Sequence, residues 1–189
     1  MAMPAPPPPD FANLSLAEIA RLAQEQRLPP VEKWNPQHCG HSDMRIARDG
    51  TWFHQGSPIG RIAMVRLFST ILRREPDGSH VLVTPVEKLD IDVEDAPFVA
   101  VELKREGEGA AMNLAFRLNT DELVSADADH GLRVEQREDG PRPYLQVRGG
   151  MEALIVRSVY NELAEIALSN DSDPPGVWSR GAFFPMEPA

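Results

Sequence analysis

The densest group of potential metal ligands in the chain is His38-Cys39-Gly40-His41, because cysteine and histidine are donors that zinc prefers in proteins. A structural zinc site takes four ligands, usually in two pairs, and Cys39 is the single cysteine of the sequence. The other histidines, His54, His80 and His130, are scattered singly. The pattern therefore favours a buried structural cysteine beside surface histidines, and we predict no metal site.

Motifs for covalent catalysis and cofactor binding are not found in the sequence. It contains no G-x-S-x-G nucleophile turn, no P-loop and no G-x-G-x-x-G fingerprint. The paired carboxylates Asp90/Asp92 and Glu94/Asp95 suit acid–base work or a cation, but solvated charge on an edge strand and turn is the simpler interpretation. We accordingly predict no catalytic residues and no cofactor.

Two predicted helix starts carry the most informative chemistry. Ser57-Pro58-Ile59-Gly60-Arg61 and Arg148-Gly149-Gly150 each place small residues and an arginine where a helix is expected to begin. Unpaired backbone N–H groups and the positive end of the helix dipole make such a start an anion site, and arginine adds bidentate geometry for phosphate or carboxylate. Trp52 or Trp178 would offer a stacking face. The alternative is that the glycines allow tight packing and the arginines pair with acids.

Two arginines, Arg66 and Arg157, interrupt apolar stretches of the predicted helices, so we expect both to be partly buried with a carboxylate partner among Asp43, Asp49 and Asp139. The candidate ligand-binding residues are Arg45, Trp52, Arg61, Arg66, Arg148 and Trp178. The candidate structural residues are Asp49, Gly50, Asp139, Gly140 and Arg157.

An internal repeat is expected to position these side chains. Residues 44–68 and 132–160 each contain an alternating run, an Asp-Gly turn (Asp49-Gly50 and Asp139-Gly140), an aromatic second run, a glycine and a Val-Arg step. Such a repeat indicates two copies of one supersecondary unit, and the junction between copies is a natural place for a ligand.

The chain divides into a sequence of predicted elements. Residues 1–13 are a Pro-rich tail that cannot pack, and a capping box at Ser15 and Glu18 predicts a helix after it. The remaining predicted elements are a hairpin over 44–54 with a type I′ turn, a helix from Ser57 to about Arg74, a strand over 80–84, strands near 89–93, 98–103, 112–118, 132–136 and 143–147, a helix over 151–168, and an extended segment over 177–184.

This order predicts an α+β protein of two small domains, 14–87 and 88–189, built on a duplicated hairpin–helix–strand unit. The hydrophobic fraction of 42% is that of an ordinary globular protein, and no apolar run approaches the roughly 18 residues of a membrane helix. The net charge of −10 disfavours nucleic acid and anionic membranes as partners, although residues 40–75 hold six arginines. We expect a cytoplasmic protein.

Several long blocks of the sequence resemble a known bacterial family. WNPQHCG (34–40), DMRIARDGTWFHQGSPIGR (43–61), LVTPVEKLDIDVEDAPFVAVE (82–102) and RPYLQVRGGMEALIVRSVY (142–160) are similar to the family called domain of unknown function 1285. The resemblance implies two α+β domains with internal duplication and a C-terminal domain like pleckstrin-homology folds. It also implies a binding site at the domain interface for a nucleotide-like ligand, and a role in signal transduction.

Three functional hypotheses follow. The first is a non-enzymatic ligand-binding or signalling protein that recognises a small anionic, nucleotide-like molecule between its two units. The second is a protein-interaction adaptor that uses an exposed sheet edge or the Pro-rich tail. The third is a metal-dependent hydrolase of a phosphorylated small molecule, which needs carboxylates that converge on a metal. The sequence leaves the oligomeric state and any protein partner open.

Overall fold

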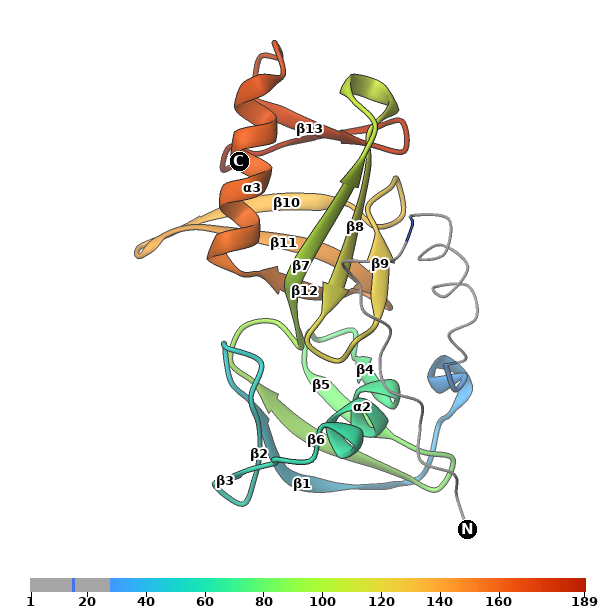
Figure 1. Cartoon of the computed structure of the whole chain (residues 1–189). Helices are drawn as coiled ribbons and strands as arrows, with labels where there is room; N and C mark the ends of the chain where they lie inside the picture. The colour runs from blue at the N-terminus through green and yellow to red at the C-terminus, as the bar shows by residue number, and fades with distance from the viewer. Residues whose placement is uncertain (1–14, 16–27) are drawn as a thin grey trace.

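The computed structural model describes residue 15 and residues 28–189 of the chain (Figure 1). The tail predicted over residues 1–13 and most of the helix predicted after it lie outside the described residues. Two six-stranded sheets lie one above the other, the N-terminal sheet at the bottom of Figure 1 and the C-terminal sheet at the top. The predicted α+β class and the two-domain organisation are confirmed.

The N-terminal domain is a sheet with one α-helix. Its elements are η2 (Val31–Lys33), β1 (His38–Ile46), β2 (Trp52–His54), β3 (Ser57–Pro58), α2 (Ile62–Thr70), β4 (Leu72–Arg74), β5 (His80–Val83) and β6 (Glu87–Val93). The strand order is β3-β2-β1-β6-β5-β4, and the central pair β1–β6 is parallel. Ile46, Leu82 and Ile91 face the core together with Val65 of α2, whereas the polar residues of β1 and β6 face outward.

The C-terminal domain also combines one sheet with one α-helix. Its elements are β7 (Phe98–Glu106), η3 (Gly109–Ala111), β8 (Asn113–Leu118), β9 (Leu123–Ser125), β10 (Leu132–Arg137), β11 (Gly140–Arg148), β12 (Met151–Ile155), α3 (Arg157–Ser169), β13 (Gly176–Ser179) and β14 (Ala182–Pro185). The strand order is β10-β11-β12-β7-β8-β9, and β13 pairs with β14 alone. Val159, Leu163 and Ile166 of α3 are buried in the core.

The two sheets share one topology. Each consists of two three-stranded antiparallel meanders, joined at the centre by a parallel pair between the first and the last strand of the sheet, β1 with β6 and β7 with β12. The helix follows the first meander in the N-terminal domain and the second meander in the C-terminal domain. A duplication is therefore present, but in this equivalence the β10–β11 turn at Asp139-Gly140 corresponds to the β4–β5 turn at Asp77-Gly78. Asp139-Gly140 was expected to correspond to Asp49-Gly50. That correspondence holds only for the order of elements along the chain, in which a hairpin and a further strand precede a helix in both places.

The two predicted Asp-Gly hairpins form, but without the expected type I′ turn. Gly50 has φ 89° and Gly140 has φ 117°, whereas the preceding aspartates keep negative φ. Gly50 N–H donates to Ala47 O at 2.9 Å, the pattern of a type I turn followed by a left-handed glycine. The Asp49 carboxylate accepts from Thr51 N–H at 2.9 Å, and this hydrogen bond lowers the pKa of Asp49.

Both predicted helix starts are wrong. Ser57-Pro58 is the short strand β3, because Gln55 and Gly56, with φ 49° and 80°, make a tight turn back onto β2; α2 begins at Ile62 and ends at Thr70. Residues 151–155 form β12 rather than a helix, since Gly149 and Gly150 have φ 57° and 75° and close a hairpin with β11. Arg148-Gly149-Gly150 is therefore a hairpin turn.

One hydrophobic core runs through both domains. Trp52, Val65 and Leu72 of the first sheet and its helix belong to the same buried cluster as Phe98 and Leu145 of the second. Since β6 pairs with β1 and β5, the first sheet extends to Val93, so the domain boundary lies beyond the expected 87–88. The pleckstrin-homology-like closure of the C-terminal domain is not confirmed.

Candidate functional site: a cavity at the domain junction

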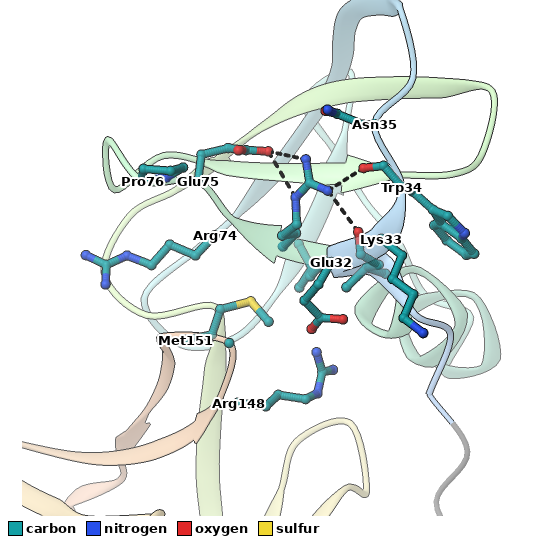
Figure 2. A pocket seen from close by; sticks show the side chains of 13 residues that line it. Glu32, Lys33, Trp34, Asn35, Arg74, Glu75, Pro76, Arg148 and Met151 are labelled. Atoms are coloured by element: carbon teal, nitrogen blue, oxygen red, sulfur yellow. Dashed lines mark hydrogen bonds and ion pairs between the residues drawn. The ribbon is translucent and has the colours of Figure 1, made fainter.

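A cavity of about 410 Å³ opens where the two domains meet (Figure 2). Its N-terminal wall comes from η2 and the strand β4 with the turn after it, and its C-terminal wall from the β11–β12 turn. The lining residues are Val31, Glu32, Lys33, Trp34, Asn35, Leu72, Arg73, Arg74, Glu75, Pro76, Arg148, Gly149 and Met151. Residues far apart in the sequence thus share one concave site of ligand-binding size.

Arg73 fixes the N-terminal wall. Its guanidinium donates to Val31 O at 2.8 Å and to Trp34 O at 2.7 Å, which ties η2 to β4. The same group forms an ion pair with Glu75 at 2.7 Å, so its charge is compensated. Val31 packs with Trp34 against Val81 and Val83 on the outer face of the sheet. The wall is therefore held by both hydrogen bonds and apolar contacts.

Arg148 fixes the C-terminal wall and joins it to the N-terminal domain. Its guanidinium pairs with Glu122 at 3.1 and 3.3 Å, donates to Ser69 O of α2 at 3.0 Å, and lies 5.1 Å from the centre of the Phe98 ring. Arg74 crosses the junction in the opposite direction, with Nη1 donating to Gly150 O at 3.2 Å. Two arginines from opposite domains therefore meet at the cavity.

Beside the cavity, Arg74 also acts on a neighbouring histidine. Burial first, and the positive charge of Arg74 second, lower the pKa of His80 below its ordinary value. His80 pairs with Arg74 across the β4–β5 hairpin. The imidazole is consequently neutral at pH 7, and its pKa depends on the charge of Arg74.

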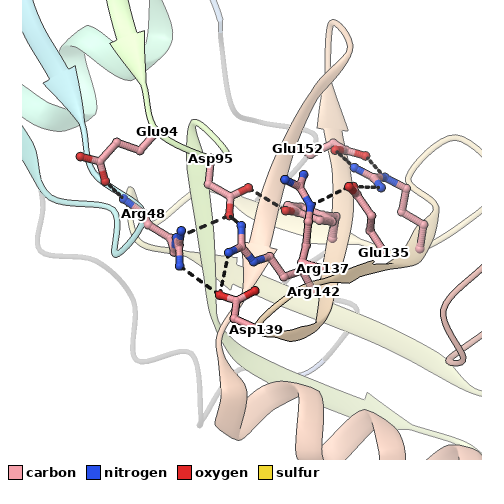
Figure 3. Close-up of polar contacts among 10 residues, drawn as sticks. Arg48, Glu94, Asp95, Glu135, Arg137, Asp139, Arg142 and Glu152 are labelled. Carbon is pink, nitrogen blue, oxygen red and sulfur yellow. Dashed lines mark hydrogen bonds and ion pairs between the residues drawn. The ribbon is translucent and has the colours of Figure 1, made fainter.

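A second group of charges at the junction, which we call the sealed cluster, consists of Arg48, Asp95, Asp139, Arg142 and Tyr144 (Figure 3). The Asp95 carboxylate is 4% exposed; it accepts from Tyr144 Oη at 2.6 Å and pairs with Arg142 at 2.8 Å. Asp139 pairs with Arg142 at 2.8 Å and with Arg48 at 3.3 Å. Burial first, and the Asp95 carboxylate next, raise the pKa of Tyr144 to about 12. In this cluster each charged side chain has an oppositely charged partner.

The six candidate ligand-binding residues are dispersed rather than gathered in one site. Arg148 lines the junction cavity, and Arg66 lies in the junction but pairs with Asp121 instead of the expected Asp43, Asp49 or Asp139. Trp52 is 1% exposed and stacks on Phe68 with ring centres 6.3 Å apart, so it offers no face to a ligand. Trp178 is half-buried against Phe183 in the β13–β14 hairpin.

Arg45 and Arg61 lie elsewhere on the N-terminal domain. Arg45 pairs with Glu94, stacks over the Phe53 ring at 4.3 Å, and lines a separate cavity of about 470 Å³ on the outer face of the sheet. Arg61 is exposed at the residue before α2. Neither residue lines the junction cavity.

Two further expectations are corrected. Arg157 is exposed at the first position of α3 rather than partly buried, because the apolar stretch before it is a strand and not a helix turn. Cys39 is exposed rather than buried, because β1 turns that residue to the outer face of its sheet. No group of three or more metal-ligating side chains occurs among residues 15 and 28–189.

Sequence reasoning missed Glu32, Lys33 and Arg74, which line the cavity. All three residues lie outside the repeat segments 44–68 and 132–160, from which the candidate site was predicted, and they belong to no recognisable motif. The Gly149-Gly150 pair was the usable signal, since adjacent glycines favour a two-residue hairpin turn. A hairpin there would have placed Arg148 at a strand end.

Comparison with known families supports this division of the chain. The N-terminal domain model of domain of unknown function DUF1285 matches residues 29–96, and the C-terminal domain model of the same family matches residues 97–186. The chain belongs to the DUF1285 family. The boundary between the two matches falls between β6 and β7, where the first sheet ends.

Two crystal structures of DUF1285 family proteins are similar to this one. The protein from Silicibacter pomeroyi is 44% identical with a TM-score of 0.77, and the alignment covers 88% of this chain and 93% of that one. The protein from Shewanella baltica is 27% identical with a TM-score of 0.50, over 67% of this chain and 94% of that one. No curated protein was found to match the chain. Within the described part of the chain, no helix has both the length and the hydropathy needed to cross a membrane.

Proposed function

We propose that this DUF1285 protein binds a small anionic ligand in the cavity between its two domains. The observation that carries the proposal is a pair of cations, Lys33 and Arg74, that line the cavity without a carboxylate partner among the described residues. In a chain of net charge −10, an uncompensated pair of cations at a concave site is a local exception.

The cavity also suits the body of such a ligand. Leu72 and Met151 lie beneath the charged groups, but at 0% and 2% exposure they offer a ligand almost no apolar contact, so it is the size of the cavity that suits a small molecule. A volume of about 410 Å³ lies within the range of small-molecule sites, which combine apolar walls with a few placed polar groups. A ligand that contacts both walls would join the two domains in addition to the hydrogen bonds of Arg74 and Arg148 across the junction.

Thermal-shift measurements and calorimetric titration across a panel of anions test the proposal. The panel includes inorganic phosphate, nucleoside mono- and diphosphates, dicarboxylates and acidic amino acids. At least one anion should raise the melting temperature, and Arg74→Ala should weaken its binding by about tenfold or more, the effect of losing one charge-assisted hydrogen bond. Arg61→Ala is the matched control, because it removes an exposed arginine that does not line the cavity.

Two results would contradict the proposal. One is that no anion of the panel stabilises the protein at millimolar concentration. The other is that Arg74→Ala and Arg61→Ala leave the affinity of a binding anion equally unchanged, which would place the site elsewhere.

The adaptor hypothesis is supported by a different surface. Ile62, Met64 and Leu67 of α2 are exposed, Leu67 by 63%, and Met64 and Leu67, three residues apart, share one face of the helix. If a protein partner docks there, Leu67→Glu should abolish its co-purification and leave anion binding unchanged. The hydrolase hypothesis gains no comparable support from the described residues.

The family resemblance also suggests a cellular location and a biological role for the proposed binding activity. We place the binding activity in the bacterial cytoplasm and in signal transduction, with a C-terminal domain that is pleckstrin-homology-like. Fractionation of cells that express the tagged protein tests the location, and recovery in a membrane or extracellular fraction would contradict it.

A further inference from the structure

One wall of the junction cavity is a short segment with its own anchorage. Residues 28–35, which we call the strap, contain η2 and supply five of the residues that line the cavity (Figure 2). Val31, Lys33 and Trp34 donate backbone hydrogen bonds to carbonyl oxygen atoms two or three residues before them. Within the described structure, no backbone hydrogen bond joins the strap to either sheet.

Two sets of contacts hold the strap on the N-terminal domain. The Arg73 guanidinium donates to Val31 O at 2.8 Å and to Trp34 O at 2.7 Å. Val31, which is 4% exposed, packs with Val81 and Val83 of β5 in a small apolar cluster. This valine cluster is separate from the main core, which holds buried residues of both sheets and both α-helices. The strap can therefore detach while the main core stays intact.

Separation of the two domains is a costlier way to move the walls of the cavity. Trp52 and Leu72 of the N-terminal domain share the main core with Phe98 and Leu145 of the C-terminal domain, and each is at most 1% exposed. Separating the domains would bring this apolar surface into water, and the free-energy cost rises with the area exposed. Detachment of the strap exposes only the smaller surface around Val31. The strap is consequently the wall that moves more easily.

We infer that the strap is a movable wall of the junction cavity: it detaches from Arg73 and the valine cluster by a local opening in the free protein, and a bound ligand holds it closed. The second half of this inference rests on the proposed function, since it concerns a ligand in the same cavity. A ligand that contacts both walls binds the closed state, because only that state has both walls in place. Binding therefore shifts the population of the strap toward closure.

Cysteine labelling of the full chain tests the local opening. In a Cys39→Ser background, Val81→Cys places a thiol in the valine cluster, and Val159→Cys places one in the main core on the buried face of α3. The two valines are equally buried, each 2% exposed. A thiol reagent should modify residue 81 at least about tenfold faster than residue 159, because access to residue 159 requires the main core to open.

Removal of the arginine contact gives the sharper result. Arg73→Gln should raise the labelling rate at residue 81 by about tenfold or more, the effect of losing charge-assisted hydrogen bonds. Arg74→Gln is the matched control, because Arg74 also lies in β4 and lines the cavity but bonds to Gly150 instead of the strap. If Val81→Cys does not fold, hydrogen exchange of the Lys33 and Trp34 amides in the same two arginine variants makes the same comparison.

The outcomes separate this inference from the proposed function. Equal labelling rates at residues 81 and 159, or equal effects of Arg73→Gln and Arg74→Gln, would overturn the inference while the anion site stands. The panel anion that raises the melting temperature most, for example inorganic phosphate, should slow labelling at residue 81 when it saturates the protein. An unchanged rate would show that the ligand does not hold the strap and would overturn that half of the inference. If no anion binds but the labelling rates differ as expected, the proposed function fails and the movable wall remains.

Discussion

The two sides of the domain junction use the same kinds of residue to opposite effect. In the sealed cluster, Arg142 and Arg48 are matched by Asp95 and Asp139, and the Asp95 carboxylate is 4% exposed. At the cavity, Lys33 and Arg74 line an open space without a carboxylate partner in the described part of the chain. The comparison shows that the presence of arginine at a domain junction does not by itself indicate a ligand site, because carboxylates can match its charge.

The difference follows from what fills the space between the sheets. On the sealed side, the Asp49-Gly50 turn lies against β7 and β8, with Asn119 donating to Gly50 O at 3.3 Å. On the cavity side, the β11–β12 turn reaches the N-terminal domain through single contacts of Arg74 and Arg148. Burial requires a partner for Asp95 and Arg142, which are 4% and 15% exposed, whereas Arg48 and Asp139 at the rim of the cluster are more than half exposed.

The largest expected effect comes from Asp95→Ala in the sealed cluster. The substitution leaves the buried Tyr144 hydroxyl without its acceptor and Arg142 without its buried partner, so the free energy of unfolding should fall by about 3 kcal/mol. Chemical denaturation measures this change. Glu32→Ala, the matched loss of a cavity carboxylate, should change the free energy of unfolding by less than about 0.5 kcal/mol. Equal losses in the two variants would remove the distinction between the two sides.

A smaller loss is expected at the turn that closes the sealed side. Gly50 has φ 89°, and a Cβ there would lie 2.7 Å from Asn119 Nδ2 and 3.0 Å from Val99 Cγ2, so Gly50→Ala should cost about 2 kcal/mol. Gly56→Ala has the same kind of backbone, φ 80°, with open space around the new methyl, and should cost about 1 kcal/mol. Urea denaturation measures both. A Gly50→Ala cost no greater than that of Gly56→Ala would show that the turn does not pack on the second domain.

The smallest effect is a change in the pKa of His80 beside the cavity. Because burial and Arg74 lower this pKa, the unfolded chain takes up a proton as the pH falls below about 6.5 while the folded protein does not, so acid pH destabilises the fold. Arg74→Gln should raise the pKa of His80 toward its ordinary value in an NMR titration. Lys33→Gln serves as the control, since Lys33 does not contribute to the shift. An unchanged pKa of His80 in Arg74→Gln would show that the charge of Arg74 does not lower this pKa.

Local sequence signals predicted the strands better than the helices. The alternation in residues 132–136 and 143–147 and the Asp-Gly turns gave hairpins in the right places. Residues 151–155 were expected to be the first turns of a helix over 151–168, although Met151, Ala153 and Ile155 alternate with the period of a strand. The segment forms a strand because it makes backbone hydrogen bonds to both β11 and β7, and local sequence patterns do not show these distant partners.

The candidate site was predicted in part for the same reason. The junction of the two units, where a ligand was predicted, does contain a cavity, and Arg148 lines it. Three other candidates were selected from their sequence neighbours alone. In the fold Arg61 is exposed, Trp52 is buried and Trp178 is half-buried, and none of them lines the cavity. Lys33 and Arg74 carry no motif, and they become notable only because their wall faces the β11–β12 turn.

The sequence by itself determined the class of fold, the positions of the two Asp-Gly hairpins, and membership of the DUF1285 family, because these depend on short-range patterns and on long blocks of residues. The tertiary structure alone decided the topology of each sheet and which charges are compensated. A charge is compensated when a partner from a distant segment lies within ion-pair distance, and parallel pairs such as β1 with β6 join the first and the last strand of a domain. Those distances are set by the fold, so only the structure shows that Glu32, Lys33 and Arg74 line one cavity without an ion pair among residues 28–189.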